Sequence, residues 1–171
     1  MGRTLANTDI NFSGEVNVLK AQMLSVVERD KVAWRAECEG RARTSQFHRQ
    51  YLTLDLDLGE RSFLNNNNNV SLISWVIKAR AELIHLNYKP WINSDNQNCS
   101  LCNRQENETT YHFIAVCPIL ANIRKNWLGE RYLNLEVYNS FLNGRDWRGL
   151  YGYLKNAWAY RWEWVLEYNT E

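Results

Sequence analysis

The hydrophobic positions of this chain follow a helical spacing over most of its length. Across residues 15–39, apolar side chains recur every three or four residues, and no proline or glycine interrupts them. This pattern predicts a long helix that ends at Gly40. A second apolar stripe with the same spacing occupies residues 71–87 and ends just before Pro90. The first half of the chain is therefore expected to be mainly helical.

Between these two helices the pattern is less decisive. Residues 52–58 alternate apolar and polar side chains, which favours a strand, whereas the helical neighbours favour an irregular linker; both interpretations remain open. Residues 65–69 are five consecutive asparagines. Asparagine is a poor helix former that hydrogen-bonds to its own backbone in turns, so this run predicts a surface loop.

The most regular segment is the last one, residues 146–168. One apolar face carries Trp147, Leu150, Leu154, Trp158, Trp162 and Val165. A second face carries Tyr153, Ala157, Tyr160, Trp164 and Tyr168. A helix that is apolar over so much of its circumference is either enclosed in a core or partly reserved for a partner. The second face is thus the best candidate for an interface with another protein or with a second copy of this chain.

Composition narrows the class of protein. The chain has 171 residues, enough for one domain with a real core, and its net charge is +1. It therefore lacks the basic excess of proteins that bind nucleic acid by charge alone. No apolar run approaches the roughly 18 residues of a membrane span, so no membrane partner is expected. The first residues form no signal-peptide core, so an intracellular localisation, nuclear or cytoplasmic, is expected.

Four residues carry the clearest chemical signal: Cys99, Cys102, His112 and Cys117, spaced C-x2-C-x9-H-x4-C. Thiolate sulfur and imidazole nitrogen are the ligands that a tetrahedral Zn²⁺ prefers, and a structural site uses four of them. In a reducing compartment, clustered cysteines indicate a metal before a disulfide. The alternative is that these residues are buried apolar filler. The fourth cysteine, Cys38, is expected to be a small buried residue on a helix.

The spacing also predicts how this segment folds. A short helix over residues 109–115 is expected to present His112, and a further helix is expected to start at Pro118 and to end at Gly129. Four protein ligands leave no open position for a catalytic water, so the zinc is expected to be structural. The nearby acids Glu106 and Glu108 are expected on the solvated face of the spacer. Folding of residues 95–125 should be coupled to metal binding.

Residues 71–128 resemble the zinc-binding domain that follows the polymerase in non-LTR retrotransposon reverse transcriptases. The matching features are a basic amphipathic helix from Trp75 through Leu86, Cys99-Ser100-Leu101-Cys102, Glu106, Glu108-Thr109, His112-Phe113, Cys117-Pro118, Arg124 and Trp127. The nine residues between the second cysteine and the histidine distinguish this pattern from the shorter retroviral nucleocapsid knuckle.

This resemblance implies a non-catalytic module, either a stand-alone fragment or a host-adopted remnant, that grips RNA or DNA. The sequence contains neither a Tyr-x-Asp-Asp polymerase signature nor a Pro-Asp followed by Glu-x-Lys, so no enzyme is expected. The basic residues implied to contact nucleic acid are Lys78, Arg80, His85, Lys89, Arg104, Arg124 and Lys125. Tyr88 and Trp91 could stack on bases.

The sequence as a whole predicts an all-α fold, a small helical domain with a zinc-clamped knuckle loop. Its expected parts are a flexible tail at 1–13, an N-terminal helical segment at 14–64, an asparagine-rich loop at 65–70 and a zinc-binding helical domain at 71–171. One alternative function remains open. The chain would be a protein-interaction scaffold that uses Tyr153, Tyr160, Trp164 and Tyr168 of its final helix and binds no nucleic acid.

Overall fold

The computed structural model describes residues 16–45, 47, 49–55, 69–89, 91 and 97–168. Within these ranges the fold is all-α, as predicted, and a single pair of residues, Asn98 and Asn107, forms an isolated antiparallel bridge. No helix in the described ranges is long and apolar enough to cross a membrane. The predicted tail at 1–13 and most of the asparagine run lie outside these ranges.

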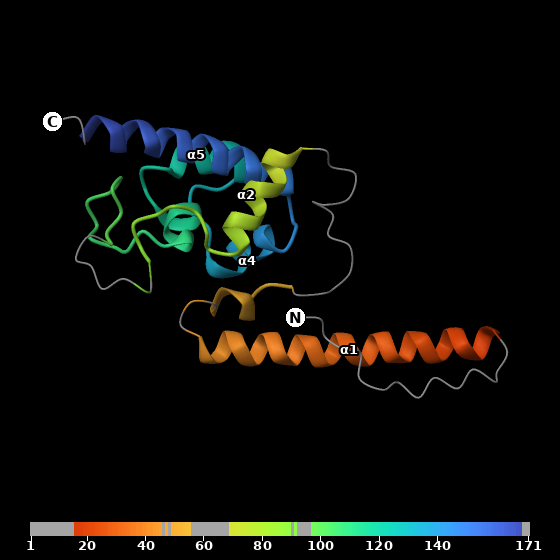
Figure 1. The fold of residues 1–171 in the computed structure, drawn as a ribbon. Coiled ribbons are helices and arrows are strands. Elements are labelled where there is room, and N and C mark those ends of the chain that lie inside the picture. Colours follow the sequence, from red (N-terminus) through yellow and green to blue (C-terminus); the bar gives the residue numbers. More distant parts are fainter. Residues whose placement is uncertain are drawn as a thin grey trace. The chain divides into compact units, whose positions relative to one another are not determined.

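The chain divides into two compact units, residues 1–41 and 42–171. The described part of the first unit belongs to helix α1, Val16–Thr44 (Figure 1). The helix does not stop at Gly40 as the sequence predicts. Glycine permits the left-handed conformation of a helix end but does not impose it, and the next four residues continue the helix. Cys38 lies on α1, as expected, and is half-buried.

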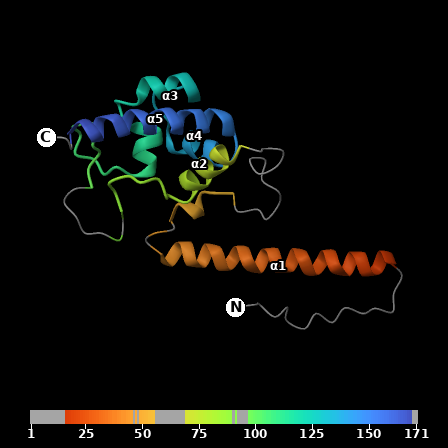
Figure 2. The same cartoon turned by 45° about the horizontal axis from the view of Figure 1, so that its top comes forward.

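The second unit holds the remaining helices. In chain order they are the short 3₁₀-helix η1 (Arg49–Leu52), α2 (Val70–Arg80), the π-helix η2 (His112–Val116), α3 (Ala121–Leu128), α4 (Leu135–Leu142) and α5 (Trp147–Tyr168). Helix α5 packs against both α2 and α3, and α4 contacts α2 and η2 (Figures 1 and 2). The long final helix is therefore the element against which both α2 and α3 pack.

The core of this unit lies between α5 and η2. Tyr153 and Leu154 of α5 are fully buried, and they meet Phe113 and Ile114 of η2, which are also fully buried. The hydroxyl of Tyr153 donates a hydrogen bond to the Phe113 carbonyl, which satisfies the polar end of a buried tyrosine. Tyr153 is thus a core residue, and its predicted role in a partner interface is wrong.

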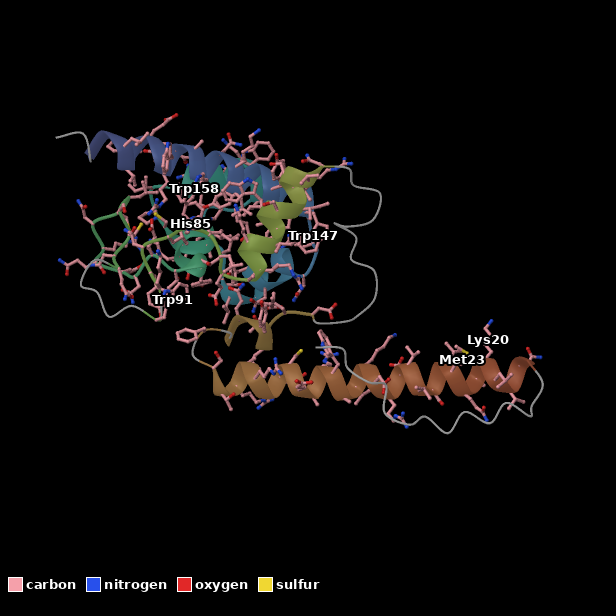
Figure 3. All side chains as sticks on the ribbon, viewed as in Figure 1. Lys20, Met23, His85, Trp91, Trp147 and Trp158 are labelled. Carbon is pink, nitrogen blue, oxygen red and sulfur yellow. The ribbon has the colours of Figure 1, made fainter. Side chains whose placement is uncertain are left out.

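A second contact joins α5 to α2. Trp158 of α5 and Trp75 of α2 lie with their ring centroids 6.0 Å apart. At the start of α5, Trp147 packs against the buried Leu72 and Val76 of α2 (Figure 3 labels Trp147 and Trp158). These contacts account for Trp147 and Trp158 of the first apolar face, whereas the third tryptophan of that face, Trp162, is exposed.

Two features of this unit differ from the sequence prediction. Helix α4, which was not predicted from the sequence, begins after Asn134, whose side chain accepts a hydrogen bond from the Val137 amide. Helix α2 ends at Arg80, about seven residues early. The chain then turns so that Ile84 and Leu86 are buried, which a continued helix would not allow. Of residues 52–58, for which a strand and a linker were both open, residues 52–55 form no strand, and residues 56–58 lie outside the described ranges.

The contact between α3 and α5 gives a prediction about stability. Gly152 of α5 faces the ring of Trp127 of α3, and a Cβ atom at this position would overlap that ring. We expect Gly152→Ala to lower the free energy of unfolding by about 1–3 kcal/mol, because the ring must move out of a packed interface. Denaturant unfolding measures this change. The exposed Lys155→Ala on the same helix should stay within about 0.5 kcal/mol of the parent, and equal stability of the two variants would contradict the packing described.

Candidate metal centre

The four predicted metal ligands come together in the second unit. The Sγ, Nδ1 or Nε2 atoms of Cys99, Cys102, His112 and Cys117 all lie within 4.8 Å of one another, and all four side chains are buried. Cys99 Sγ is 3.9 Å from Cys117 Sγ, and Cys102 Sγ is 3.4 Å from His112 Nε2. A tetrahedral ion with ordinary bond lengths would place two sulfurs roughly 3.8 Å apart and a sulfur and a nitrogen roughly 3.6 Å apart. The arrangement therefore fits a tetrahedral metal ion.

A short hairpin positions the first two cysteines. The Cys99 amide donates to the Glu106 carbonyl, and the Glu108 amide donates to the Gln97 carbonyl. The turn between the two sides includes Gln105 at a φ of +56°, a left-handed conformation that few residues other than glycine adopt. The hairpin folds Cys99 and Cys102 onto the same side of the loop.

The π-helix η2 positions the other two ligands. The chain is helical from Thr110, and the Thr109 hydroxyl accepts a hydrogen bond from the His112 amide. The Cys117 amide then donates to the His112 carbonyl, five residues earlier. This wider turn brings His112 and Cys117 to the same side, whereas an ordinary α-helix repeats every 3.6 residues. The H-x4-C spacing is thus explained by one π turn, which replaces part of the short helix predicted at 109–115.

Hydrogen bonds and burial shift the pKa values of the three thiols in opposite directions: that of Cys117 is lowered, whereas those of Cys99 and, through burial, Cys102 are raised. The hydrogen bond between the sulfurs of Cys99 and Cys117 lowers the pKa of Cys117; the same bond, together with burial, raises the pKa of Cys99 to about 12. The backbone amide of Leu101 also points to the Cys99 sulfur, and those of Ile119 and Leu120 point to the Cys117 sulfur. Amide donors of this kind stabilise thiolates, which are the form that binds a metal.

Glu106 completes the surroundings of His112. Its carboxylate Oε2 lies 3.0 Å from His112 Nδ1, while Nε2 of the same ring faces Cys102. Burial lowers the pKa of His112, but hydrogen bonds and charge from Cys99 and Glu106 outweigh it and raise the pKa above its ordinary value. A carboxylate that holds Nδ1–H leaves Nε2 free to bind a metal and fixes the ring orientation. Glu106 is exposed, as predicted from the sequence, but its contact with His112 was not predicted.

Glu108 is the clearest departure from the sequence prediction, because it is fully buried rather than solvated. Both of its carboxylate oxygens accept hydrogen bonds from the Arg161 guanidinium of α5, at 2.8 and 2.7 Å. The backbone N–H of Asn87 donates to the Glu108 carboxylate at 2.8 Å, and the side-chain oxygen of Asn87 accepts a hydrogen bond from Arg161 at 3.0 Å. A buried, bidentate ion pair thus joins the metal-binding hairpin to the final helix.

Arg124, one of the predicted nucleic-acid contacts, is also fully buried. Its guanidinium donates to the carbonyls of Ile114, at 2.6 Å, of Cys117, at 3.0 Å, and of Arg131. These bonds satisfy carbonyls at the end of η2, where the metal ligand Cys117 lies. A phosphate group cannot reach a guanidinium enclosed in this way, so Arg124 is a structural residue and its predicted contact with nucleic acid is wrong.

The other predicted basic residues lie at or near the surface. The Arg80 guanidinium donates to the carbonyls of Leu142 and Asp55 and is half-buried, and the Lys78 ammonium lies 5.5 Å from the Trp75 ring centroid. The side chains of His85, Arg104 and Lys125 are exposed, and that of Lys89 is half-buried.

Two residues of the predicted partner interface lie beside the metal-binding loop. Tyr160 and Trp164 of α5 have ring centroids 6.0 Å apart. They line a cavity of about 500 Å³ together with Ser100, Leu101, Asn103 and Ile119, which flank the metal ligands. The fourth predicted interface residue, Tyr168, ends α5, and its side chain lies outside the described part of the structure.

Comparisons with protein-family models, with curated proteins and with solved structures find no match for this chain. The likeness to the zinc-binding domain of reverse transcriptases therefore rests on the motif residues alone. What the chain itself establishes is an all-α fold with four buried cysteine and histidine side chains close enough to hold one metal ion.

Proposed function

We propose that this protein is a non-catalytic, retrotransposon-derived module in which one structural Zn²⁺ holds a nucleic-acid-binding surface for RNA or DNA. The observation that carries the metal assignment is the set of three sulfurs and one imidazole nitrogen at tetrahedral separations. Zinc is the divalent ion that most often takes such a soft, four-ligand site. Cys99, Cys102, Cys117 and His112 would hold the ion, and Glu106 would orient His112.

The nucleic-acid part of the proposal is supported by the exposed cations close to the metal ligands in the sequence. Arg104 follows Cys102 by two residues, and Lys125 lies on α3, just after Cys117. His85 and Lys89 lie in the segment between α2 and the hairpin. Cations of this kind attract the phosphate backbone, while the aromatic side chains of Tyr88 and Trp91 offer faces on which bases can stack.

The test is a fluorescence titration of the zinc-loaded protein with single-stranded RNA and with duplex DNA, at low and at near-physiological salt. We expect binding that weakens steeply as salt rises, because each phosphate contact releases a counterion. Arg104→Gln combined with Lys125→Gln should reduce the slope of log affinity against log salt by about 0.7–0.9 for each phosphate that the variant no longer neutralises.

Lys20→Gln, on α1 in the first compact unit, is the matched control and should leave that slope unchanged. Absence of binding by the folded, zinc-loaded protein would refute the nucleic-acid function. Equal slopes for the parent and the double variant would remove Arg104 and Lys125 from the binding surface.

A second candidate function has its own support. The end of α5 exposes Trp162, Trp164 and Leu166, and exposed tryptophans of this kind are typical of protein interfaces. In this alternative the zinc holds a helical scaffold and the end of α5 binds a protein or a second copy of the chain. Analytical ultracentrifugation of the parent and of Trp162→Ser tests self-association. If α5 binds a second copy of the chain, the mass of the parent should rise with concentration and that of the variant should not.

A further inference from the structure

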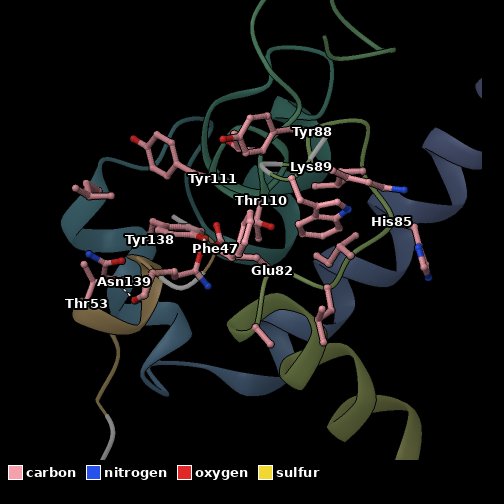
Figure 4. Close-up of a pocket in the computed structure, with 18 residues that line it drawn as sticks. Phe47, Thr53, Glu82, His85, Tyr88, Lys89, Thr110, Tyr111, Tyr138 and Asn139 are labelled. Atoms are coloured by element: carbon pink, nitrogen blue, oxygen red, sulfur yellow. Dashed lines mark hydrogen bonds between the residues drawn. The ribbon is translucent and has the colours of Figure 1, made fainter. Parts of the chain in front are cut away.

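A second cavity lies in the second unit, and residues 109–111, which directly precede His112, form part of its wall. It has a volume of about 550 Å³, which is within the usual range for small-ligand pockets. It is bounded by Phe47 and the η1 segment, the end of α2, residues 83–89, Trp91, residues 109–111 and α4 (Figure 4). Its polar lining includes Glu82, His85 and Lys89. The structure thus gathers two predicted nucleic-acid residues, His85 and Lys89, at one cavity.

The walls of this cavity are aromatic. Phe47 and Trp91 meet edge to face with ring centroids 5.9 Å apart, and Tyr111 and Tyr138 do the same at 5.1 Å. Tyr88 contributes a fifth ring. Aromatic rings prefer planar, polarisable partners that can stack or pack edge to face, as nucleobases do. A flat heterocycle therefore suits this space better than a flexible aliphatic chain.

Glu82 is the acid of the cavity, and its backbone is in an unusual conformation. The Leu83 amide donates to the Lys78 carbonyl and the Glu82 amide donates to the Ala79 carbonyl, which together form a Schellman end to α2. In this motif the residue at the position of Glu82 is left-handed, and its φ is +54°. Glycine is the residue that fits here without steric cost, so a glutamate at this position is a local strain of the kind found at functional sites.

The Glu82 carboxylate is also chemically available. Among the residues that the structure describes, no hydrogen-bond donor or cation is paired with it. The Glu82 carboxylate lies among the rings in Figure 4. Burial is the main cause that raises the pKa of Tyr138, and the charge of Glu82 raises it further. Burial raises the pKa of Glu82 itself. The Glu82 side chain is exposed, so its two acceptor oxygens are open to solvent and can accept hydrogen bonds from a ligand that brings donors.

The cavity has a basic end. In Figure 4, His85 and Lys89 lie on the side opposite Tyr138 and Asn139. A ligand that fills the cavity should therefore be planar, should present adjacent donors to Glu82 and should carry negative charge toward Lys89. A cationic peptide side chain would satisfy Glu82 but would meet the Lys89 charge.

We propose that this cavity binds one unstacked guanine base of a nucleic acid, read by the Glu82 carboxylate and enclosed by Trp91 and the neighbouring rings. Guanine N1–H and N2–H₂ are adjacent donors that match the two oxygens of a carboxylate. Adenine, cytosine and uracil each place an acceptor next to the donors of that edge, which a carboxylate repels. The proposal rests on the nucleic-acid function proposed above and assigns its base preference.

The test uses guanosine 5′-monophosphate as the probe and follows tryptophan fluorescence and amide chemical shifts of the zinc-loaded protein. We expect saturable binding of the guanine nucleotide that is at least about tenfold tighter than that of the adenine, cytosine and uracil nucleotides. A difference of this size is what one well-placed bidentate hydrogen-bonded pair contributes. Glu82→Gln should remove the preference for guanine. Glu163→Gln, an exposed acid on α5, is the control and should keep it.

Glu82→Gly separates a functional loss from a folding defect. Because glycine relieves the left-handed strain, this variant should be at least as stable as the parent to heat, yet it should lose guanine selectivity. Selectivity that survives in Glu82→Gln, equal binding of all four nucleotides, or tighter binding of a guanidinium compound than of the guanine nucleotide would overturn the proposal.

An oligonucleotide without guanine distinguishes this inference from the function on which it rests. If such an oligonucleotide binds in a salt-dependent way and guanine adds nothing, the nucleic-acid module stands and the guanine pocket is wrong. If neither the oligonucleotide nor the nucleotide binds, both proposals fail.

Discussion

Replacing Cys117 by serine is expected to abolish metal binding and to unfold the metal-binding segment. Cys117 is fully buried, its sulfur is 3.9 Å from that of Cys99, and its amide closes the π turn that presents His112. Structural zinc sites contribute on the order of 10 kcal/mol at neutral pH, most of which is folding free energy of the segment that supplies the ligands. Removal of one ligand should therefore have a larger effect than any other single change in this protein.

Metal content by mass spectrometry and amide chemical-shift dispersion together measure this effect. Cys102→Ser should behave in the same way, because it removes another ligand of the same set. Cys38→Ser is the matched control: Cys38 lies on α1 and is no part of the cluster, so this variant should keep one zinc per chain. Full zinc occupancy in Cys117→Ser would refute the ligand assignment.

The second large effect is expected at the buried ion pair. Glu108→Gln should leave the Arg161 guanidinium buried with a weakened partner, and Arg161→Met should leave the Glu108 carboxylate buried without one. Breaking a buried pair from one side costs about 3–5 kcal/mol. For a protein of this size, that loss lowers the midpoint of thermal unfolding by roughly 10 °C.

Calorimetry of the zinc-loaded variants measures this change. Arg35→Met, which removes an exposed ion pair on α1, should change stability by less than about 1 kcal/mol. The double variant Glu108→Gln/Arg161→Met should recover part of the stability, because it leaves no unpaired charge. A destabilisation no larger than that of Arg35→Met would show that the pair does not hold the hairpin to α5.

The cluster of three cysteines and one histidine could be predicted from the sequence because the whole cluster is local. All four ligands lie between Cys99 and Cys117, and one hairpin and one π turn bring them together. Spacing along the chain then carries most of the information about position in space. The all-α class was equally accessible, since long helices are recognisable by the spacing of their apolar residues.

The surroundings of the centre could not be predicted in this way. Glu108 and Arg161 are 53 residues apart, and each looks like an ordinary surface charge in the sequence. Arg124 likewise resembles a phosphate contact until its three backbone acceptors are seen. Whether a charged residue faces water or the interior depends on packing between distant elements, and spacing does not report that.

Helix ends show a similar limit. Gly40 is the stronger sequence signal for a helix end, but it lies within α1. Helix α2 ends at Arg80, and the left-handed residue that follows its end is Glu82 rather than a glycine. The burial of Ile84 and Leu86 accompanies the second ending. Helix α4 was not predicted, although Asn134 followed by an apolar stripe is a recognisable start.

X-ray absorption at the zinc edge of the purified protein tests the central claim most directly. We expect one zinc per chain with three sulfur neighbours at about 2.3 Å and one nitrogen neighbour at about 2.0–2.1 Å. Protein that takes up no zinc, or zinc surrounded by oxygen and nitrogen without sulfur, would contradict the assignment.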